Sequence, residues 1–381
     1  MANQPDPTIA TTQNTIKPVK IGLIGVGNIS KQYINGCRVY PILEIAACAD
    51  IDMERTRAVA AEYGIPKACT VEELLADPVI EIVINLTIPK VHAQVSLQIL
   101  AAGKHAYSEK PLAINTVDGK QILESAQAKG LRLGCAPDTF LGGGQQTSRW
   151  VIDNGLIGRP IAANAFFASR GPEPWHPNPD FFYQMGGGPM LDMGPYYVTA
   201  LVNLFGPVKR VSGAANAAFT ERIAGHPSQQ GKRIPVEVPT HYAGILEFSS
   251  GAVATLVASF DIWSNHQHPP ISVFGTEGNL SVPDPNTFGG TVKVSQHNEA
   301  WRDVPLTHSD KIGRGTGVAD LAYAIQSSRP ARATGELAYH VLEVMTAVEK
   351  ASQSGHYVAI ESQPAQPKPL PVGLPEGELD R

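Results

Sequence analysis

A glycine-rich turn near the start of the chain carries the first chemical signal. It reads Gly25-Val26-Gly27-Asn28-Ile29-Ser30, ends a short apolar run and opens a helical pattern. In dinucleotide-binding proteins the first glycine permits a tight bend, and the second lets the backbone approach a pyrophosphate at the helix N-terminus. The third small position, usually glycine or alanine, is Ser30 here. The turn predicts a nucleotide site that includes Gly25, Gly27, Asn28 and Ile29.

Asp50 extends this signal. It follows the second apolar run, 23 residues after Gly27, where an acidic side chain accepts hydrogen bonds from ribose hydroxyls. A carboxylate there would repel a 2′-phosphate, so we predict NAD as the cofactor. NADP is the alternative, because Arg55 and Arg57 lie nearby. A second interpretation of Asp50 is a charge that only stabilises a helix N-terminus.

Three further positions bear on ligand binding. Trp175 and His176 lie in a proline-rich loop, and an aromatic face with polar neighbours suits stacking on a sugar. Asp138 follows the fourth apolar run, at the sheet edge where α/β proteins bind ligands. We expect these residues to contact substrate. His266 and His268 have no third metal ligand in view, so no metal site is predicted.

The elements that would position these residues alternate in type over the first 140 residues. Short apolar runs typical of buried parallel strands occur at Val19–Gly25, Leu43–Ala49, Ile80–Leu86 and Leu131–Ala136. Helical patterns lie between them at Ile51–Tyr63, Val91–Ala102 and Val117–Lys129. Strict alternation predicts an α/β fold whose N-terminal domain, residues 19–138, is a Rossmann doubly wound parallel sheet.

The pattern changes after Thr139 to that of an α+β domain over residues 139–361, with an open, largely antiparallel sheet. Its predicted elements are strands at Tyr242–Phe248, Ala252–Trp263, Ile271–Phe274 and Asn279–Val282 and a helix at Glu336–Ser352. The outer face of the second strand is only half polar, so we expect a homodimer or homotetramer through this sheet. Residues 1–18 are predicted to form a flexible arm, and the proline-rich residues 362–381 an extended tail.

Composition excludes several classes of function. The chain has 381 residues, of which 17% are charged, and a formal net charge of −5. This balance does not suit a nucleic-acid partner, and the apolar runs are shorter than the roughly 20 residues of a membrane span. The N-terminus lacks the apolar stretch of a secretory signal. Four cysteines without a Cys-x-x-Cys spacing predict buried free thiols and a cytoplasmic protein.

Three short segments resemble the pattern of the Gfo/Idh/MocA family: Thr87-Ile88-Pro89 with His92, Ala102-Gly103-Lys104-His105, and Glu109-Lys110-Pro111. This family includes glucose–fructose oxidoreductase, inositol dehydrogenases and many sugar dehydrogenases. The resemblance runs from about Val19 to Ile360, and the Glu-Lys-Pro tripeptide at the end of a Rossmann strand is its most specific element. It implies that Lys110 is a catalytic lysine that contacts nicotinamide and substrate. It also implies a cofactor lining formed by Thr87, Pro89, His92 and Glu109.

The second catalytic segment departs from the family pattern. Many members carry Asp-x-x-x-His after a glycine-rich segment, whereas here Asp192 is followed by Tyr196. Either Tyr196 serves as the acid/base, or catalysis has been lost or reassigned. A four-residue spacing puts the two side chains on one helix face, but Pro195 would break that helix, which then begins near Gly194. The adjacent Tyr197 is expected to contact substrate.

Together these residues predict an NAD(P)-dependent oxidoreductase. It would transfer a hydride between the cofactor and a hydroxyl carbon of a sugar, glycoside or cyclic polyol, with Tyr196 taking the hydroxyl proton. Two alternatives remain: a glycosidase in which NAD oxidises the sugar transiently, and a regulatory protein that only binds NAD. Retention of Lys110 and Asp192 argues against the regulator, because a sensor needs no base.

Overall fold

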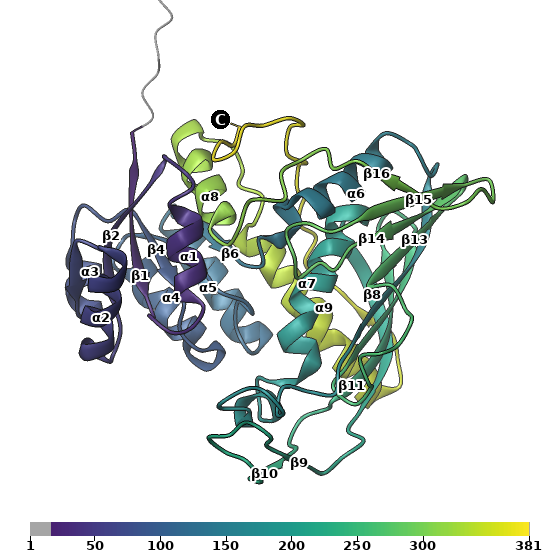
Figure 1. Ribbon diagram of the computed structural model, residues 1–381, viewed down its shortest axis with the longest axis horizontal. Coiled ribbons are helices and arrows are strands. Elements are labelled where there is room, and N and C mark those ends of the chain that lie inside the picture. Colours follow the sequence, from purple (N-terminus) through teal and green to yellow (C-terminus); the bar gives the residue numbers. More distant parts are fainter. Residues whose placement is uncertain (1–16, 381) are drawn as a thin grey trace, which may run out of the picture.

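The computed structural model describes residues 17–380 and contains two large sheets (Figure 1). The first sheet is six-stranded, with the order β3-β2-β1-β4-β5-β6, and all its pairings are parallel. Its strands are β1 (Val19–Ile24), β2 (Leu43–Ala49), β3 (Lys67–Cys69), β4 (Ile82–Asn85), β5 (His105–Ser108) and β6 (Leu133–Cys135). Its helices are α1 (Ser30–Cys37), α2 (Met53–Tyr63), α3 (Val71–Ala76), α4 (His92–Ala101) and α5 (Thr116–Ala128).

This arrangement confirms the predicted doubly wound parallel sheet. The four predicted strands are β1, β2, β4 and β6, and the three predicted helices are α2, α4 and α5. The strand order reverses between β1 and β4, and the crevice at such a switch point is where doubly wound sheets bind dinucleotides. The short elements β3 and α3 were not predicted, because three and six residues are too few to show a periodic pattern of apolar residues.

The second sheet has nine strands in the order β16-β15-β14-β13-β7-β12-β11-β8-β17. Strands β7 and β12 run parallel, and the other described pairings are antiparallel. Its strands are β7 (Pro160–Ala168), β8 (Val208–Asn216), β11 (His241–Phe248), β12 (Val253–Ser259), β13 (Ile271–Gly275), β14 (Gly278–Val282), β15 (Val292–Gln296), β16 (Arg302–Val304) and β17 (Val358–Ala359). A separate hairpin joins β9 (Glu221–Ile223) and β10 (Arg233–Pro235). The predicted open, largely antiparallel sheet is therefore confirmed.

Four more helices complete the fold of residues 17–380, and α6, α7 and α9 among them lie between the two sheets (Figure 1). They are α6 (Gly143–Asp153), α7 (Gly188–Phe205), α8 (Thr316–Ser327) and α9 (Gly335–Ser354), with short 3₁₀ turns η1 (Pro89–Val91), η2 (Thr139–Leu141) and η3 (Asp180–Tyr183). In Figure 1, α6, α7 and α9 cover the face of the large sheet that is turned towards the first sheet. None of the helices in residues 17–380 combines the length and apolarity that a membrane crossing requires.

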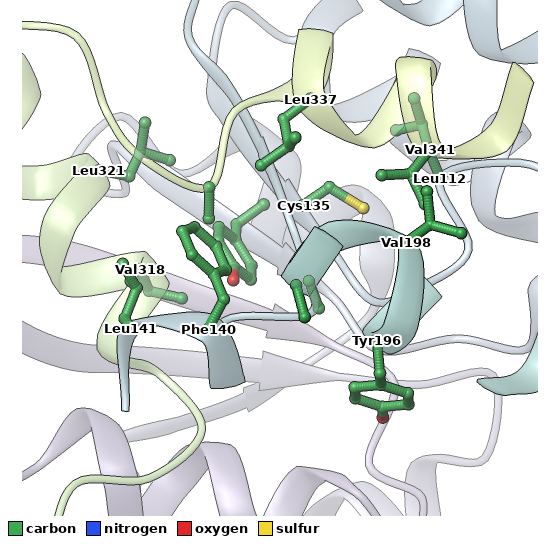
Figure 2. Close-up of a cluster of buried hydrophobic side chains, with 14 of the residues drawn as sticks. Leu112, Cys135, Phe140, Leu141, Tyr196, Val198, Val318, Leu321, Leu337 and Val341 are labelled. Carbon is green, nitrogen blue, oxygen red and sulfur yellow. The ribbon is translucent and has the colours of Figure 1, made fainter. Parts of the chain in front are cut away.

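One continuous hydrophobic core joins both parts of the chain. Figure 2 shows Leu112 beside Val198 of α7 and Val341 of α9, with Leu321 of α8 at the other side of the same cluster. Helix α8 packs on α1 and β6, so the chain returns to the first sheet late in a segment that the sequence analysis assigned to the second domain. This shared core holds α7 against the ends of β5 and β6.

Residues 361–380 at the C-terminus form neither helix nor strand, but several of them pack against the rest of the protein. Leu370 and Leu379 are buried, and Asp380 lies 2.8 Å from the guanidinium of Arg332. The C-terminal segment therefore lies against the body of the protein. The predicted arm at residues 1–18 falls almost entirely outside the described residues.

Candidate active site

The glycine turn after β1 has the geometry that a dinucleotide needs. Gly25 has φ +101°, and a Cβ there would come within 2.6 Å of the carbonyl oxygen of Leu86 after β4. Only glycine tolerates that conformation and contact. A Cβ on Gly27 would meet nothing within 4 Å, so open space lies above the start of α1. The residues present therefore fit a pyrophosphate on the α1 N-terminus.

Asp50, at the end of β2, holds this turn in place. Its Oδ2 accepts a hydrogen bond from the backbone N–H of Val26 at 2.9 Å, and its Oδ1 accepts one from Arg55 at 2.9 Å. Burial alone would raise the pKa of Asp50, but these hydrogen bonds hold it below its ordinary value. Asp50 is therefore a carboxylate at the nucleotide turn, with one cation already beside it.

Among the residues expected to line the cofactor after β4 and β5, His92 makes its contacts within the protein. His92 is almost fully buried. Its Nδ1 lies 2.7 Å from the carbonyl oxygen of Pro111 and its Nε2 lies 3.0 Å from that of Thr87. Burial lowers the pKa of His92. The ring ties the Thr87–Pro89 turn to the segment that carries Lys110, and it has no free polar atom to offer a cofactor.

Lys110, Asp192 and Tyr196 come together at the carboxyl end of β5. The Nζ of Lys110 donates to Oδ1 of Asp192 at 2.9 Å and to its carbonyl oxygen at 2.7 Å. The same nitrogen lies over the ring of Tyr196, 5.1 Å from the centroid. Burial alone would lower the pKa of Lys110, but the carboxylate of Asp192 outweighs burial and raises it. The lysine therefore remains an ammonium.

Helix α7 carries Asp192 and Tyr196 on one face, and it begins at Gly188 rather than near Gly194. The expected break at Pro195 is wrong: the helix continues through it. Proline removes one backbone hydrogen bond from a helix, but nearly every residue from Gly194 to Phe205 is buried. Tertiary packing outweighs the local cost of the proline and keeps the two side chains in register.

Arg314, which the sequence analysis missed, completes this cluster. Its Nη2 donates a hydrogen bond to the hydroxyl of Tyr196 at 2.7 Å, and its Nη1 lies 3.7 Å from the carboxylate of Glu109. Glu109 also accepts a hydrogen bond from Tyr33 of α1 at 2.7 Å. Burial alone would raise the pKa of Glu109, but Arg314 and Lys110 hold it below its ordinary value. The glycines on both sides of Arg314 mark a turn, yet nothing local links it to Tyr196.

Two of the expected substrate contacts face the interior instead. Asp138 is fully buried, and its Oδ2 accepts the backbone N–H groups of Gly315 and Gly317 at 2.9 and 3.0 Å. It therefore anchors the start of α8. Tyr197 is also buried and packs on Phe167, with ring centroids 6.0 Å apart, because adjacent helical residues point to different faces. The expectation that Asp138 and Tyr197 contact substrate is therefore wrong, because both side chains are buried.

The other two expected contacts lie on an aromatic loop between β7 and η3. Trp175 is 64% exposed, and its ring centroid lies 5.4 Å from that of His176. His176 in turn packs edge-on against Phe182 at 5.1 Å. Burial lowers the pKa of His176. Across residues 17–380, the structure contains no group of three metal-binding side chains.

Comparison with known proteins identifies the family. A family model described as an oxidoreductase family with an NAD-binding Rossmann fold matches residues 19–136. A second, the GFO/IDH/MocA C-terminal domain, matches residues 146–281. The trans-1,2-dihydrobenzene-1,2-diol dehydrogenase of Macaca fascicularis is 30% identical over 78% of this chain and 84% of that protein. This chain belongs to the GFO/IDH/MocA oxidoreductase family.

Other relatives of this GFO/IDH/MocA oxidoreductase agree. The 1,5-anhydro-D-fructose reductase of Ensifer adhaerens is 29% identical over 90% of this chain and 98% of that protein. Among solved structures, levoglucosan dehydrogenase in complex with NADH and L-sorbose superposes with a TM-score of 0.78. It is 19% identical and covers 90% of this chain and 99% of that one, so it supports the fold alone. The chain is therefore an NAD(P)-dependent oxidoreductase, as the sequence predicted.

Proposed function

We propose that this oxidoreductase transfers a hydride between NAD(P) and a hydroxyl carbon of a sugar, glycoside or cyclic polyol. One observation carries the proposal: the Lys110 ammonium, the Asp192 carboxylate and the Tyr196 phenol form one cluster at the end of β5. The cluster lies on the edge where a parallel sheet binds its ligands. The names of the relatives support the substrate class, since anhydrofructose and dihydrobenzene-diol are cyclic compounds with oxygen substituents.

The chain's residues divide the chemistry between them. When bound, the nicotinamide supplies the hydride acceptor for oxidation and the donor for reduction. Lys110 donates a hydrogen bond to the substrate oxygen and offsets the negative charge that develops there. Asp192 keeps Lys110 charged and fixes its direction. Tyr196 exchanges the hydroxyl proton, and the exposed ring of Trp175 offers a face for the substrate ring.

A substrate panel tests this proposal. The purified protein is incubated with NAD or NADP and a set of sugars, cyclitols and glycosides, and reduced nicotinamide is measured. We expect accumulation of reduced cofactor with at least one cyclic substrate. Release of a new reducing sugar without net cofactor reduction would favour the glycosidase alternative. Tight NAD binding without turnover of any substrate would favour a regulatory protein.

We also propose that the protein is a cytoplasmic homodimer or homotetramer assembled through the large sheet. The outward face of β11 and β12 exposes Ile245 and Val253 at 39% and 42%, and Phe166 of β7 continues this face beside Val257. Such a face is more apolar than a monomer's surface needs. The four cysteines, free and buried in the structure, suit a reducing compartment.

A further inference from the structure

The hydrogen bond between Arg314 and Tyr196 has a fixed direction. A guanidinium has only donors, so the Tyr196 oxygen must be the acceptor in the 2.7 Å contact with Arg314 Nη2. The hydroxyl hydrogen of Tyr196 is therefore free to donate elsewhere. Among residues 17–380, Tyr196 makes no second hydrogen bond. In Figure 2 the Tyr196 hydroxyl points away from the other labelled side chains of the cluster.

Contacts hold both the guanidinium and the backbone of Arg314 in place. Its guanidinium lies 3.7 Å from Glu109 and 4.0 Å from Asp138, and its side chain is 9% exposed. At the backbone, its carbonyl oxygen packs so closely on α1 that a Cβ on Gly36 would come within 1.8 Å of it. The next residue, Gly315, donates its N–H to Asp138. The guanidinium therefore has little freedom to move away from Tyr196.

Lys110 does not contact the Tyr196 hydroxyl oxygen in the way that Arg314 does. Its Nζ lies over the face of the Tyr196 ring and is occupied by Asp192, whereas Arg314 contacts the phenol oxygen directly. The charged groups around the phenol are thus Lys110 over the ring and Arg314 at the oxygen, with Asp192, Glu109 and Asp138 paired to those two cations.

We propose that Arg314 is a positioning residue that turns the proton of Tyr196 towards the substrate and stabilises the phenolate left behind. The inference rests on the proposed function of Tyr196. In reduction, the phenol O–H bond breaks, its proton forms the new O–H bond of the product, and the electron pair remains on the tyrosine oxygen. The nicotinamide supplies the hydride, and water later returns the proton. In oxidation the same phenolate, held by Arg314, accepts the hydroxyl proton.

A double-mutant cycle tests this inference. The turnover number for carbonyl reduction is measured for the wild type, Arg314→Met, Tyr196→Phe and the double variant. We expect Arg314→Met to lower kcat by about 10²-fold, as loss of one charge-stabilising donor does. Tyr196→Phe should lower kcat by about 10²–10⁴-fold. In the Tyr196→Phe background, Arg314→Met should have almost no further effect, because the group it acts through is gone. Arg314→Lys should recover part of the loss, since lysine keeps a charged donor.

The outcomes separate the inference from the proposed function. If Tyr196→Phe turns over like the wild type, the acid/base assignment itself fails. If Tyr196→Phe is impaired but the two losses multiply, Arg314 is only structural and the inference is overturned. NADH affinity and melting temperature are measured for each variant, so that unfolding is recognised. Arg332→Met is the matched control: Arg332 is also a buried arginine and is paired with Asp320 at 2.6 Å, but its hydrogen bonds go to Asp320, Asp380 and backbone carbonyls rather than to Tyr196. It should lower the melting temperature and leave kcat unchanged.

Discussion

The Nζ of Lys110 lies 2.9 Å from a carboxylate oxygen of Asp192 and 2.7 Å from the carbonyl oxygen of the same residue. The two residues are 82 positions apart in the chain, one at the end of β5 and the other on α7. This pair joins the nucleotide-binding sheet to the helix that carries Tyr196. Its geometry depends on the docking of α7, so the proposed catalytic cluster exists only in the folded chain.

Lys110→Met should abolish most turnover without unfolding the protein. The variant removes the donor to the substrate oxygen, and we expect kcat to fall by about 10²-fold or more. The matched control is Lys67→Met, since Lys67 forms an ion pair of the same 2.9 Å length with Asp77 on the surface. Exposed pairs of this kind contribute about 0–1 kcal/mol. Steady-state kinetics and thermal melts of both variants test this prediction. If Lys110→Met is as active as Lys67→Met, Lys110 has no role in the mechanism.

Asp50→Asn should weaken NAD binding and reduce the difference in affinity between NAD and NADP. The asparagine keeps an acceptor for the N–H of Val26 but removes the charge. A hydrogen bond to a charged group contributes about 1.5–3 kcal/mol, or roughly ten- to a hundredfold in affinity. Calorimetric titration with both cofactors measures the change. Asp52→Asn, which alters the α2 cap at Arg55, should leave affinity unchanged. Tighter NADP binding by the wild type would contradict the prediction.

Ile245→Glu should dissociate the proposed oligomer. The residue lies on the outward face of β11, opposite Thr255 of β12, and a buried, unpaired carboxylate at an interface is strongly unfavourable. Sedimentation velocity should give a smaller species for the variant at the same concentration. Ile223→Glu is the control, because Ile223 is 61% exposed on the separate β9 hairpin. A wild-type protein that sediments as a monomer would remove the basis for this prediction.

His340 should make the protein less stable in mild acid. Its Nε2 accepts the N–H of Val208 at 3.0 Å, and burial lowers its pKa to about 4. An unfolded chain binds the proton near pH 6.5. The stability that His340 contributes is therefore complete above about pH 6.5 and is lost as the pH falls towards 4, by up to about 3 kcal/mol. Urea unfolding should show that the free energies of unfolding of the wild type and His340→Gln become more similar as the pH falls over that range. A difference that stays constant with pH would contradict this prediction.

The sequence alone determined the parts of this protein that depend on short stretches of chain. The apolar run of β1, the glycine turn and Asp50 lie close together in the sequence, and backbone geometry there leaves few alternatives. The family pattern also singled out Lys110 and Asp192, which the structure brings into contact. In each case the signal is carried by residue types at a short, fixed spacing.

Only the tertiary structure decided which distant side chains meet. Arg314 lies 118 residues from the Tyr196 hydroxyl that it contacts, and no local pattern joins them. Asp138 sits at a ligand-binding edge by sequence, but α8 docks there and its backbone N–H groups take the carboxylate. Helix α7 runs through Pro195 because burial of its length outweighs one lost hydrogen bond. Such outcomes follow from how helices pack on sheets, and that packing sums many weak contacts between segments far apart in the chain.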